Sequence, residues 1–182
     1  PTRLTTSNKS FYEKIDFYES LWTEKSIFQD YEQTKKNVLG LKAFIDSCKP
    51  EYCLTHIDAV PDNFLFSINS DGKEEIQLID WEYAGMQDSH VDIAMFCIYS
   101  LYKERSEIDR LIDFYFDGKC TPQNRIKIYC YVALCGLLWS NWCEYKRQLG
   151  VEFGEYSLMQ YRYAKDYFKI ATEEIKKLEL KK

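Results

Sequence analysis

Three polar residues with catalytic potential lie at fixed spacing in the first half of the chain: His56, Asp58 and Asn63, in the pattern H-x-D-x-x-x-x-N. A fourth, Asp80, follows a short apolar run. In phosphoryl transfer, one carboxylate orients the attacking hydroxyl and accepts its proton, while amide and carboxylate oxygens hold the magnesium ions. The pattern therefore predicts Asp58 as catalytic base, with Asn63 and Asp80 as ligands of Mg²⁺. Alone, the same residues could be turn formers in a solvated loop.

The segment after these first three residues has the pattern of a β-hairpin. Residues 64–68 are apolar and prone to form a strand, residues 69–72 read Asn-Ser-Asp-Gly, and residues 76–79 form a second strand. Such a hairpin would place Asn63 and Asp80 at the ends of adjacent strands. Two oxygen ligands in this position can converge on one ion.

Most of the remaining sequence has helical periodicity. Helices are predicted over residues 11–22, 29–47, 92–103, 106–116, 121–149 and 156–178. Ser106 is expected to cap the fourth helix, and Thr121-Pro122 to open the fifth. There is no glycine-rich phosphate loop and no early sheet with a lysine for the nucleotide phosphates.

The expected fold class is mainly α with a small β-hairpin, as in the C-terminal lobe of a protein-kinase-like fold. Residues 1–182 are expected to form a single domain, and the N-terminal nucleotide lobe is expected to be absent. Its parts would be leading helices at 11–48, a catalytic loop and metal hairpin at 53–82, and a helical substrate-binding subdomain at 91–178.

Composition narrows the class of protein. The 182 residues are 46% hydrophobic and 16% aromatic, which indicates a packed globular chain. A net charge of −5 argues against a nucleic-acid partner. Seven cysteines without a C-x-x-C pair favour reduced thiols in a cytoplasmic protein, and two histidines argue against a zinc site. No signal peptide or apolar run of spanning length occurs, so no membrane insertion is expected.

The two motifs resemble those of the choline/ethanolamine kinase family. Residues 55–65, Thr-His-Ile-Asp-Ala-Val-Pro-Asp-Asn-Phe-Leu, resemble its catalytic segment, and residues 79–85, Ile-Asp-Trp-Glu-Tyr-Ala-Gly, its metal segment. The aminoglycoside phosphotransferases share the general pattern but usually not the Trp-Glu-Tyr-Ala continuation. The likeness extends over residues 11–178 and is closest to the bacterial branch that makes phosphocholine. It implies ATP as phosphoryl donor, Mg²⁺ as cofactor and choline as substrate.

Aromatic residues late in the chain resemble the family's choline pocket. Trp139 and Trp142 lie three apart in a predicted helix, so their rings can lie side by side. A quaternary ammonium has no N–H donor and is held by ring faces through cation–π attraction. Tyr163 and Tyr83 would complete the box, although a tryptophan pair in a helix can also be ordinary core. No role is assigned to Tyr99, Tyr102, Tyr145 and Tyr156.

Three further residues are given supporting roles. His56 is expected to be structural, holding the catalytic loop in place. Glu82, two residues beyond Asp80 in an extended segment, would face the same side near the metal, and a solvated glutamate fits equally well. Asp92 is expected to accept hydrogen bonds from amides of the catalytic loop, or to act as an N-cap.

The sequence departs from the family pattern in two places. Ile57 stands where a small or polar residue is common, and residues 96–99 lack the acidic residue of animal enzymes. Because a primary ammonium needs carboxylate partners, this absence favours choline over ethanolamine. Another small aminoalcohol or an aminoglycoside remains an alternative substrate, and a non-catalytic choline-binding module an alternative of another class. Without a nucleotide lobe, the chain by itself is expected to be inactive; its oligomeric state is left open.

Overall fold

The computed structural model describes residues 10–180, which fold around one long helix. In chain order, the helices are α1 (Phe11–Ser20), α2 (Tyr31–Gly40), α3 (Lys42–Ser47), α4 (His90–Tyr99), α5 (Arg105–Tyr115), α6 (Pro122–Gln148) and α7 (Glu155–Glu179). The strands are β1 (Tyr52–Thr55), β2 (Phe64–Ile68), β3 (Glu74–Leu78) and β4 (Gly85–Asp88), with 3-10 turns at Pro61–Asn63 and Trp81–Tyr83. The predicted class, mainly α with a small hairpin, is confirmed.

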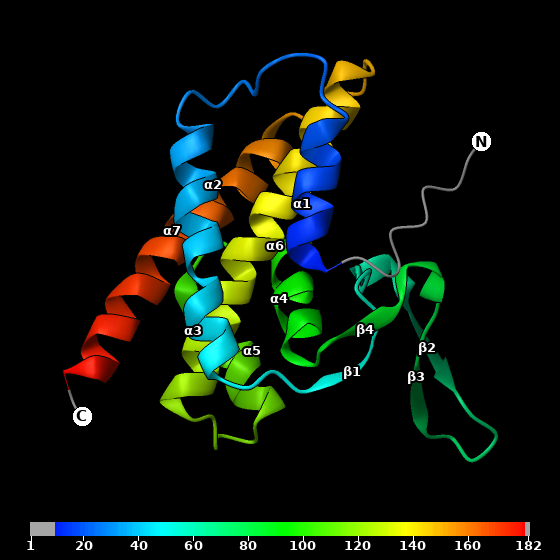
Figure 1. Cartoon of the computed structure of the whole chain (residues 1–182). Helices are drawn as coiled ribbons and strands as arrows, with labels where there is room; N and C mark the ends of the chain where they lie inside the picture. The colour runs from blue at the N-terminus through cyan, green and yellow to red at the C-terminus, as the bar shows by residue number, and fades with distance from the viewer. Residues whose placement is uncertain (1–9, 181–182) are drawn as a thin grey trace.

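Helix α6 lies at the centre of the helical body (Figure 1). It contacts α1, α2, α3, α4 and α7, and every residue from Ile126 to Leu138 is buried. A helix buried on all faces needs no polar stripe, and this explains the largely apolar sequence of this stretch, in which the one charged residue, Lys127, is paired with Asp88 at 2.7 Å. Its predicted start is confirmed: Thr121 Oγ1 accepts a hydrogen bond from the amide of Asn124 at 3.1 Å, and Pro122 occupies the first turn.

Helix α7 approaches α6 closely because Gly136 has no side chain. A Cβ at this position would lie 2.7 Å from the carbonyl oxygen of Gln160, 2.7 Å from Tyr163 Cβ and 2.9 Å from the amide nitrogen of Ala164. Two of these three atoms belong to the backbone of α7 and cannot rotate away. The spacing of the two helices that carry most of the late aromatic residues therefore depends on one glycine.

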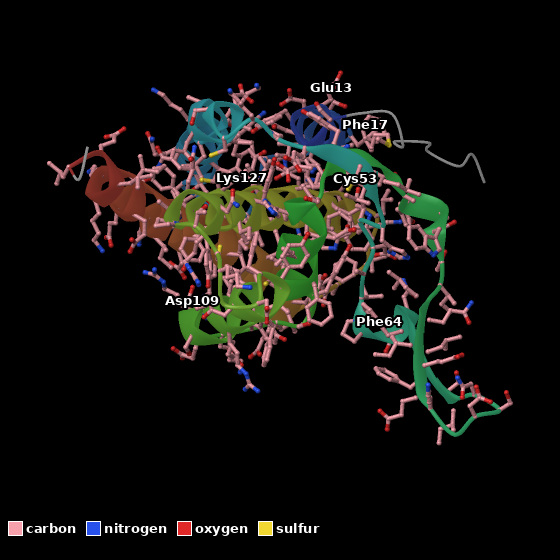
Figure 2. The ribbon with its side chains drawn as sticks, turned by 90° about the horizontal axis from the view of Figure 1, so that it is seen from below. Glu13, Phe17, Cys53, Phe64, Asp109 and Lys127 are labelled. Carbon is pink, nitrogen blue, oxygen red and sulfur yellow. The ribbon has the colours of Figure 1, made fainter. Side chains whose placement is uncertain are left out.

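The predicted hairpin is formed by β2 and β3, with Phe64 opposite Leu78. Its turn is closed by a 2.9 Å hydrogen bond from the amide of Asn69 to the carbonyl of Lys73. Figures 1 and 2 show the hairpin extending away from the helices, and Figure 2 shows Phe64 at its base. Several of its apolar side chains are consequently exposed: Leu65, Phe66, Ile68 and Ile76.

A second two-stranded ribbon was not predicted from the sequence. Strands β1 and β4 pair antiparallel, with Tyr52 opposite Asp88 and Thr55 opposite Gly85. The β4 sequence Gly-Met-Gln-Asp lacks the β-branched and aromatic residues that favour strands, so only its partner reveals it. This ribbon delivers the chain into the catalytic loop at one end and into α4 at the other.

Three predicted helix boundaries are wrong. The helix expected over 29–47 is two helices, α2 and α3, with α2 ending at Gly40, a residue of low helix propensity. Helix α4 ends at Tyr99 rather than residue 103, and Leu101 beyond it has a left-handed φ of +53°. Helix α5 is capped by Glu104 in a capping box, not by Ser106. No helix within residues 10–180 is long and apolar enough to cross a membrane.

Candidate active site

The carboxylate of Asp92, in the first turn of α4, binds the backbone of the predicted catalytic loop at residues 56 and 57. Its Oδ2 accepts a hydrogen bond from the amide of His56 at 2.9 Å, and its Oδ1 from the amide of Ile57 at 2.8 Å. These are the contacts expected from the sequence. Ile57 has φ +70°, a conformation that costs an L-residue about 1–2 kcal/mol. Hydrogen bonds to a charged acceptor contribute about 1.5–3 kcal/mol each and offset that strain.

The imidazole of His56 connects the catalytic loop to the end of β3. The ring is buried, and its Nε2 lies 2.8 Å from the carbonyl oxygen of Ile79. Because a carbonyl only accepts, Nε2 carries the proton in this contact. The ring also packs edge-on against Trp81, with 4.7 Å between centroids. These contacts match a structural role and place His56 between the two predicted motifs.

The β2–β3 pairing brings Asn63 next to Asp80. The amide of Ile79, which precedes Asp80, donates to the carbonyl of Asn63 at 3.0 Å. The Asn63 side-chain amide donates to the main-chain oxygen of Asp58 at 2.9 Å, which leaves its Oδ1 free to bind a cation. The Asp80 carboxylate has no hydrogen bond or ion pair with another residue of the described part of the chain. One amide oxygen and one carboxylate fit Mg²⁺, which takes its other ligands from water and substrate phosphates.

No group of three or more His, Cys, Asp or Glu side chains in residues 10–180 could hold a metal alone.

The expectation that Asp80 and Glu82 lie along one extended segment is wrong. Asp80 has φ +63° and ψ +63°, and Trp81–Tyr83 form a 3-10 turn. Side chains two residues apart face the same side only in a strand, so the spacing of Asp80 and Glu82 does not place both carboxylates on one side. The turn is held by Trp81, whose Nε1 donates to the carbonyl of Leu78 at 2.9 Å. Glu82 is exposed, and a role near the metal stays a prediction.

A pocket of about 440 Å³ opens beside Asp58. Its lining residues are Lys14, Tyr18, Ile57, Asp58, Tyr83, Tyr99, Leu138, Trp139, Trp142, Phe153 and Tyr156. Trp139, Trp142 and Tyr83, three of the four aromatic residues proposed from the sequence, are therefore brought together with the proposed base. The two tryptophan rings are stacked, with centroids 6.1 Å apart and planes inclined by 21°.

The structure does not bring Tyr163 to this pocket. Tyr163 is buried, and its hydroxyl donates to the main-chain oxygen of Tyr102 at 2.6 Å. The residue of α7 that lines the pocket is Tyr156, two helical turns earlier. Residues two turns apart share a helix face but are separated by about 10 Å along the axis. The sequence pattern identified the correct face of α7 and the wrong turn.

Lys14, Tyr18 and Phe153 line the pocket and were missed in the sequence. The first two lie in α1, where their spacing is indistinguishable from that of ordinary core residues. Phe153 lies between α6 and α7, in a segment bounded by Gly150 and Gly154, which have φ of +84° and +52°. Its ring centroid is 5.0 Å from that of Trp142. The two glycines on either side of Phe153 were the available sequence signal that this loop adopts a backbone conformation that other residues disfavour.

The phenols of the pocket stay neutral near neutral pH. Burial raises the pKa of Tyr99 well above its usual value, and the neighbouring Asp58 carboxylate adds to the shift. Burial also raises the pKa of Tyr83, with further contributions from Glu82, Asp58 and Asp80. The Tyr99 hydroxyl is buried next to the Asp58 carboxylate, so a neutral polar group lies directly beside the proposed base.

The sequence also matches a family model. The model of the phosphotransferase enzyme family aligns with residues 10–124, which include the catalytic loop, the hairpin and α4. The chain belongs to the phosphotransferase enzyme family.

Similar proteins refine this assignment. The phosphotransferase chain is 26% identical over 163 residues to Protein LicA of Haemophilus influenzae, covering 82% of this chain and 57% of that relative. The crystal structure of LicA in complex with AMP matches with a TM-score of 0.72 and 30% identity, covering 89% of this chain and 54% of the other. Choline kinase LicA from Streptococcus pneumoniae matches with a TM-score of 0.72 and 29% identity, covering 88% and 55%.

These comparisons confirm the resemblance to choline kinases inferred from the sequence. The chain spans about half the length of the relatives it matches. The family model ends at residue 124, before the aromatic residues of α6 and α7, whereas the two solved structures cover nearly nine tenths of the chain.

Proposed function

We propose that this phosphotransferase chain is part of a choline kinase that transfers the γ-phosphate of ATP to the hydroxyl of choline and yields phosphocholine. The observation that carries the proposal is that Asp58 and the stacked pair Trp139 and Trp142 line one cavity of about 440 Å³. Choline carries its hydroxyl two carbons from a trimethylammonium group. A site for choline therefore needs a base and an aromatic surface within one small pocket.

The lining of the pocket favours a quaternary ammonium. Ring faces attract such a cation by about 0.5–2 kcal/mol each, depending on desolvation. Asp58 is the only carboxylate among the lining residues, so a primary ammonium would find few acceptors for its N–H groups. An aminoglycoside carries several ammonium groups and would need more carboxylates than this pocket offers.

The proposed reaction assigns one task to each polar residue. Asp58 accepts a hydrogen bond from the choline hydroxyl, directs its oxygen toward the phosphorus and takes the proton. Asn63 Oδ1 and Asp80 would hold Mg²⁺, which neutralises charge on the phosphates when bound. Asp92 and His56 keep the loop in place through their main-chain contacts. Because the LicA crystal structure contains AMP, an adenine nucleotide, that relative supports ATP as the donor.

The test separates chemistry from binding. ADP formation by the full-length kinase of which this chain is proposed to be a part is measured with ATP, Mg²⁺ and either choline or ethanolamine, for the wild type, Asp58→Asn and Asp62→Asn. Asp62 is exposed in the same loop and serves as the matched control. Loss of a positioned base is expected to lower kcat by about 10²–10⁴-fold in Asp58→Asn only. Unchanged turnover in Asp58→Asn would remove Asp58 from the role of base.

Binding is measured by calorimetry with choline and ethanolamine. Trp142→Ala is expected to weaken choline by about tenfold, because a desolvated ring contributes up to about 2 kcal/mol. Choline affinity equal to that of the wild type would show that the stacked pair is core and not part of the substrate site.

A further inference from the structure

Lys14 places an amine in the pocket proposed for a cationic substrate. The residue lies in α1, is only 5% exposed, and lines the pocket together with Asp58 and Trp142. Its Nζ lies 5.5 Å from the centroid of the Phe11 ring. No carboxylate of residues 10–180 forms an ion pair or hydrogen bond with it. A lysine so deeply buried is normally paired, so Lys14 is exceptional in this fold.

Burial makes the charged form of Lys14 costly. An ammonium loses much of its hydration in this position and gains no ion-pair partner in return. Desolvation by burial lowers the pKa of Lys14. A second cation in the same cavity would raise the cost of the charged form further, because like charges repel strongly where water is excluded.

The groups that face Lys14 do not neutralise it. The lining hydroxyls are neutral near neutral pH because burial raises the pKa of each of them: Tyr18, Tyr83, Tyr99 and Tyr156. Cys135 of α6 is also neutral, since burial raises the pKa of its thiol. Asp92 is engaged by two amides of the catalytic loop. Asp58 is the one carboxylate that lines the pocket, and it makes no ion pair with Lys14.

We propose that Lys14 is a specificity-determining residue of this pocket. Protonation of its amine and binding of the cationic headgroup of the substrate are mutually exclusive. The inference rests on the proposed choline kinase function and deepens it. When choline binds, the Lys14 ammonium loses one proton to solvent and stays as a neutral amine. Affinity for a cationic amino alcohol then increases with pH, by up to about tenfold per unit while free Lys14 is protonated. A neutral alcohol of the same shape binds independently of Lys14 and of pH.

The experiment pairs a charge on the protein with a charge on the ligand. Choline and its uncharged carbon analogue 3,3-dimethyl-1-butanol are titrated by calorimetry into the wild type, Lys14→Met and Lys42→Met at pH 6.5 and 8.5. Lys42 is exposed on α3 and ion-paired with Asp46 at 2.5 Å, so its variant is the matched control. Each titration is repeated in two buffers of different ionisation enthalpy, which counts the protons released and needs no variant.

The expected result is specific to one residue and one ligand. At pH 6.5, Lys14→Met binds choline at least about tenfold more tightly than the wild type, as removal of a nearby like charge predicts. The wild type and Lys42→Met release protons on binding choline, and Lys14→Met does not. The carbon analogue shows the same affinity in all three proteins.

Three outcomes would overturn the inference. If choline affinity and proton release are the same in wild type and Lys14→Met, Lys14 does not sense the headgroup, and the choline kinase proposal stands without it. If Lys14→Met binds choline more weakly, Lys14 supports the site instead of opposing the cation. If neither protein binds choline at either pH, the proposed function is wrong, and the inference about Lys14, which depends on it, is wrong as well.

Discussion

Replacing Gly136 with alanine is expected to destabilise the contact between α6 and α7. The new methyl carbon would lie 2.7 Å from the carbonyl oxygen of Gln160 and 2.9 Å from the amide nitrogen of Ala164. Neither backbone atom can rotate away, so α7 must move as a unit. The same movement would separate Tyr156 from the aromatic residues of α6, so choline affinity is expected to fall together with stability.

The magnitude follows from two opposing effects. Overpacking a tight contact costs about 1–3 kcal/mol. Alanine has a higher helix propensity than glycine, which returns at most about 1 kcal/mol. The free energy of unfolding should therefore fall by about 1–2 kcal/mol, and the Tm by about 2–8 °C for a chain of this size.

Thermal unfolding followed by far-UV circular dichroism provides the measurement, with Gly40→Ala as the control. Gly40 ends α2, and a Cβ there would meet nothing within 4 Å. The Tm of the Gly40→Ala variant should equal or exceed that of the wild type, since alanine reduces the conformational entropy of the unfolded chain. A Gly136→Ala protein that melts at or above the wild-type temperature would refute the close approach of the two helices.

Two further predictions concern Asp92, which supports the catalytic loop, and His90, the first residue of α4. Asp92→Asn keeps one acceptor but loses the charge that binds two amides, so the free energy of unfolding measured in urea should fall by about 2–3 kcal/mol. Asp117→Asn, whose carboxylate is 94% exposed, should change it by less than about 0.5 kcal/mol, and equal midpoints for the two variants would contradict the reasoning. Burial, and then the Lys127 charge, lower the pKa of His90, so the unfolded chain binds this proton more tightly than the folded chain. The stability contributed by neutral His90 is complete above its unfolded pKa of about 6.5 and is lost as the pH falls through the lowered folded value. His90→Asn should therefore flatten the decline in Tm between pH 7.5 and 5, and an unchanged slope would exclude His90 as its cause.

The polar part of the site could be predicted from short-range spacing. Asn63 and Asp80 lie at the two open ends of a hairpin, and the strand and turn signals between them are local. Their proximity therefore follows from the sequence once the hairpin is recognised. The hydrogen bonds of Asp92 to the catalytic loop were predictable for a similar reason, because an acidic residue in the first turn of a helix commonly accepts hydrogen bonds from nearby backbone amides.

The aromatic part depends on how separate helices are packed. The family resemblance pointed to Tyr163 of α7, but only the axial position of α7 against Gly136 selects Tyr156 over Tyr163. Lys14 enters the pocket because α1 packs on α6, which no local pattern records. The left-handed backbone of Ile57 and Asp80 was also unpredictable, since neither residue is glycine and tertiary contacts impose the conformation.

The hairpin that carries Asn63 and Asp80 affects how the isolated chain will behave in solution. Strands β2 and β3 pair only with each other within residues 10–180, so the outer edge of each has unpaired backbone groups. Side chains such as Phe66, which is 75% exposed, add apolar surface to these edges. Open strand edges with apolar side chains promote intermolecular β-pairing. We therefore expect that association of chains through the edges of the β2–β3 hairpin, rather than unfolding of the helical core, limits the concentration at which the chain stays in solution.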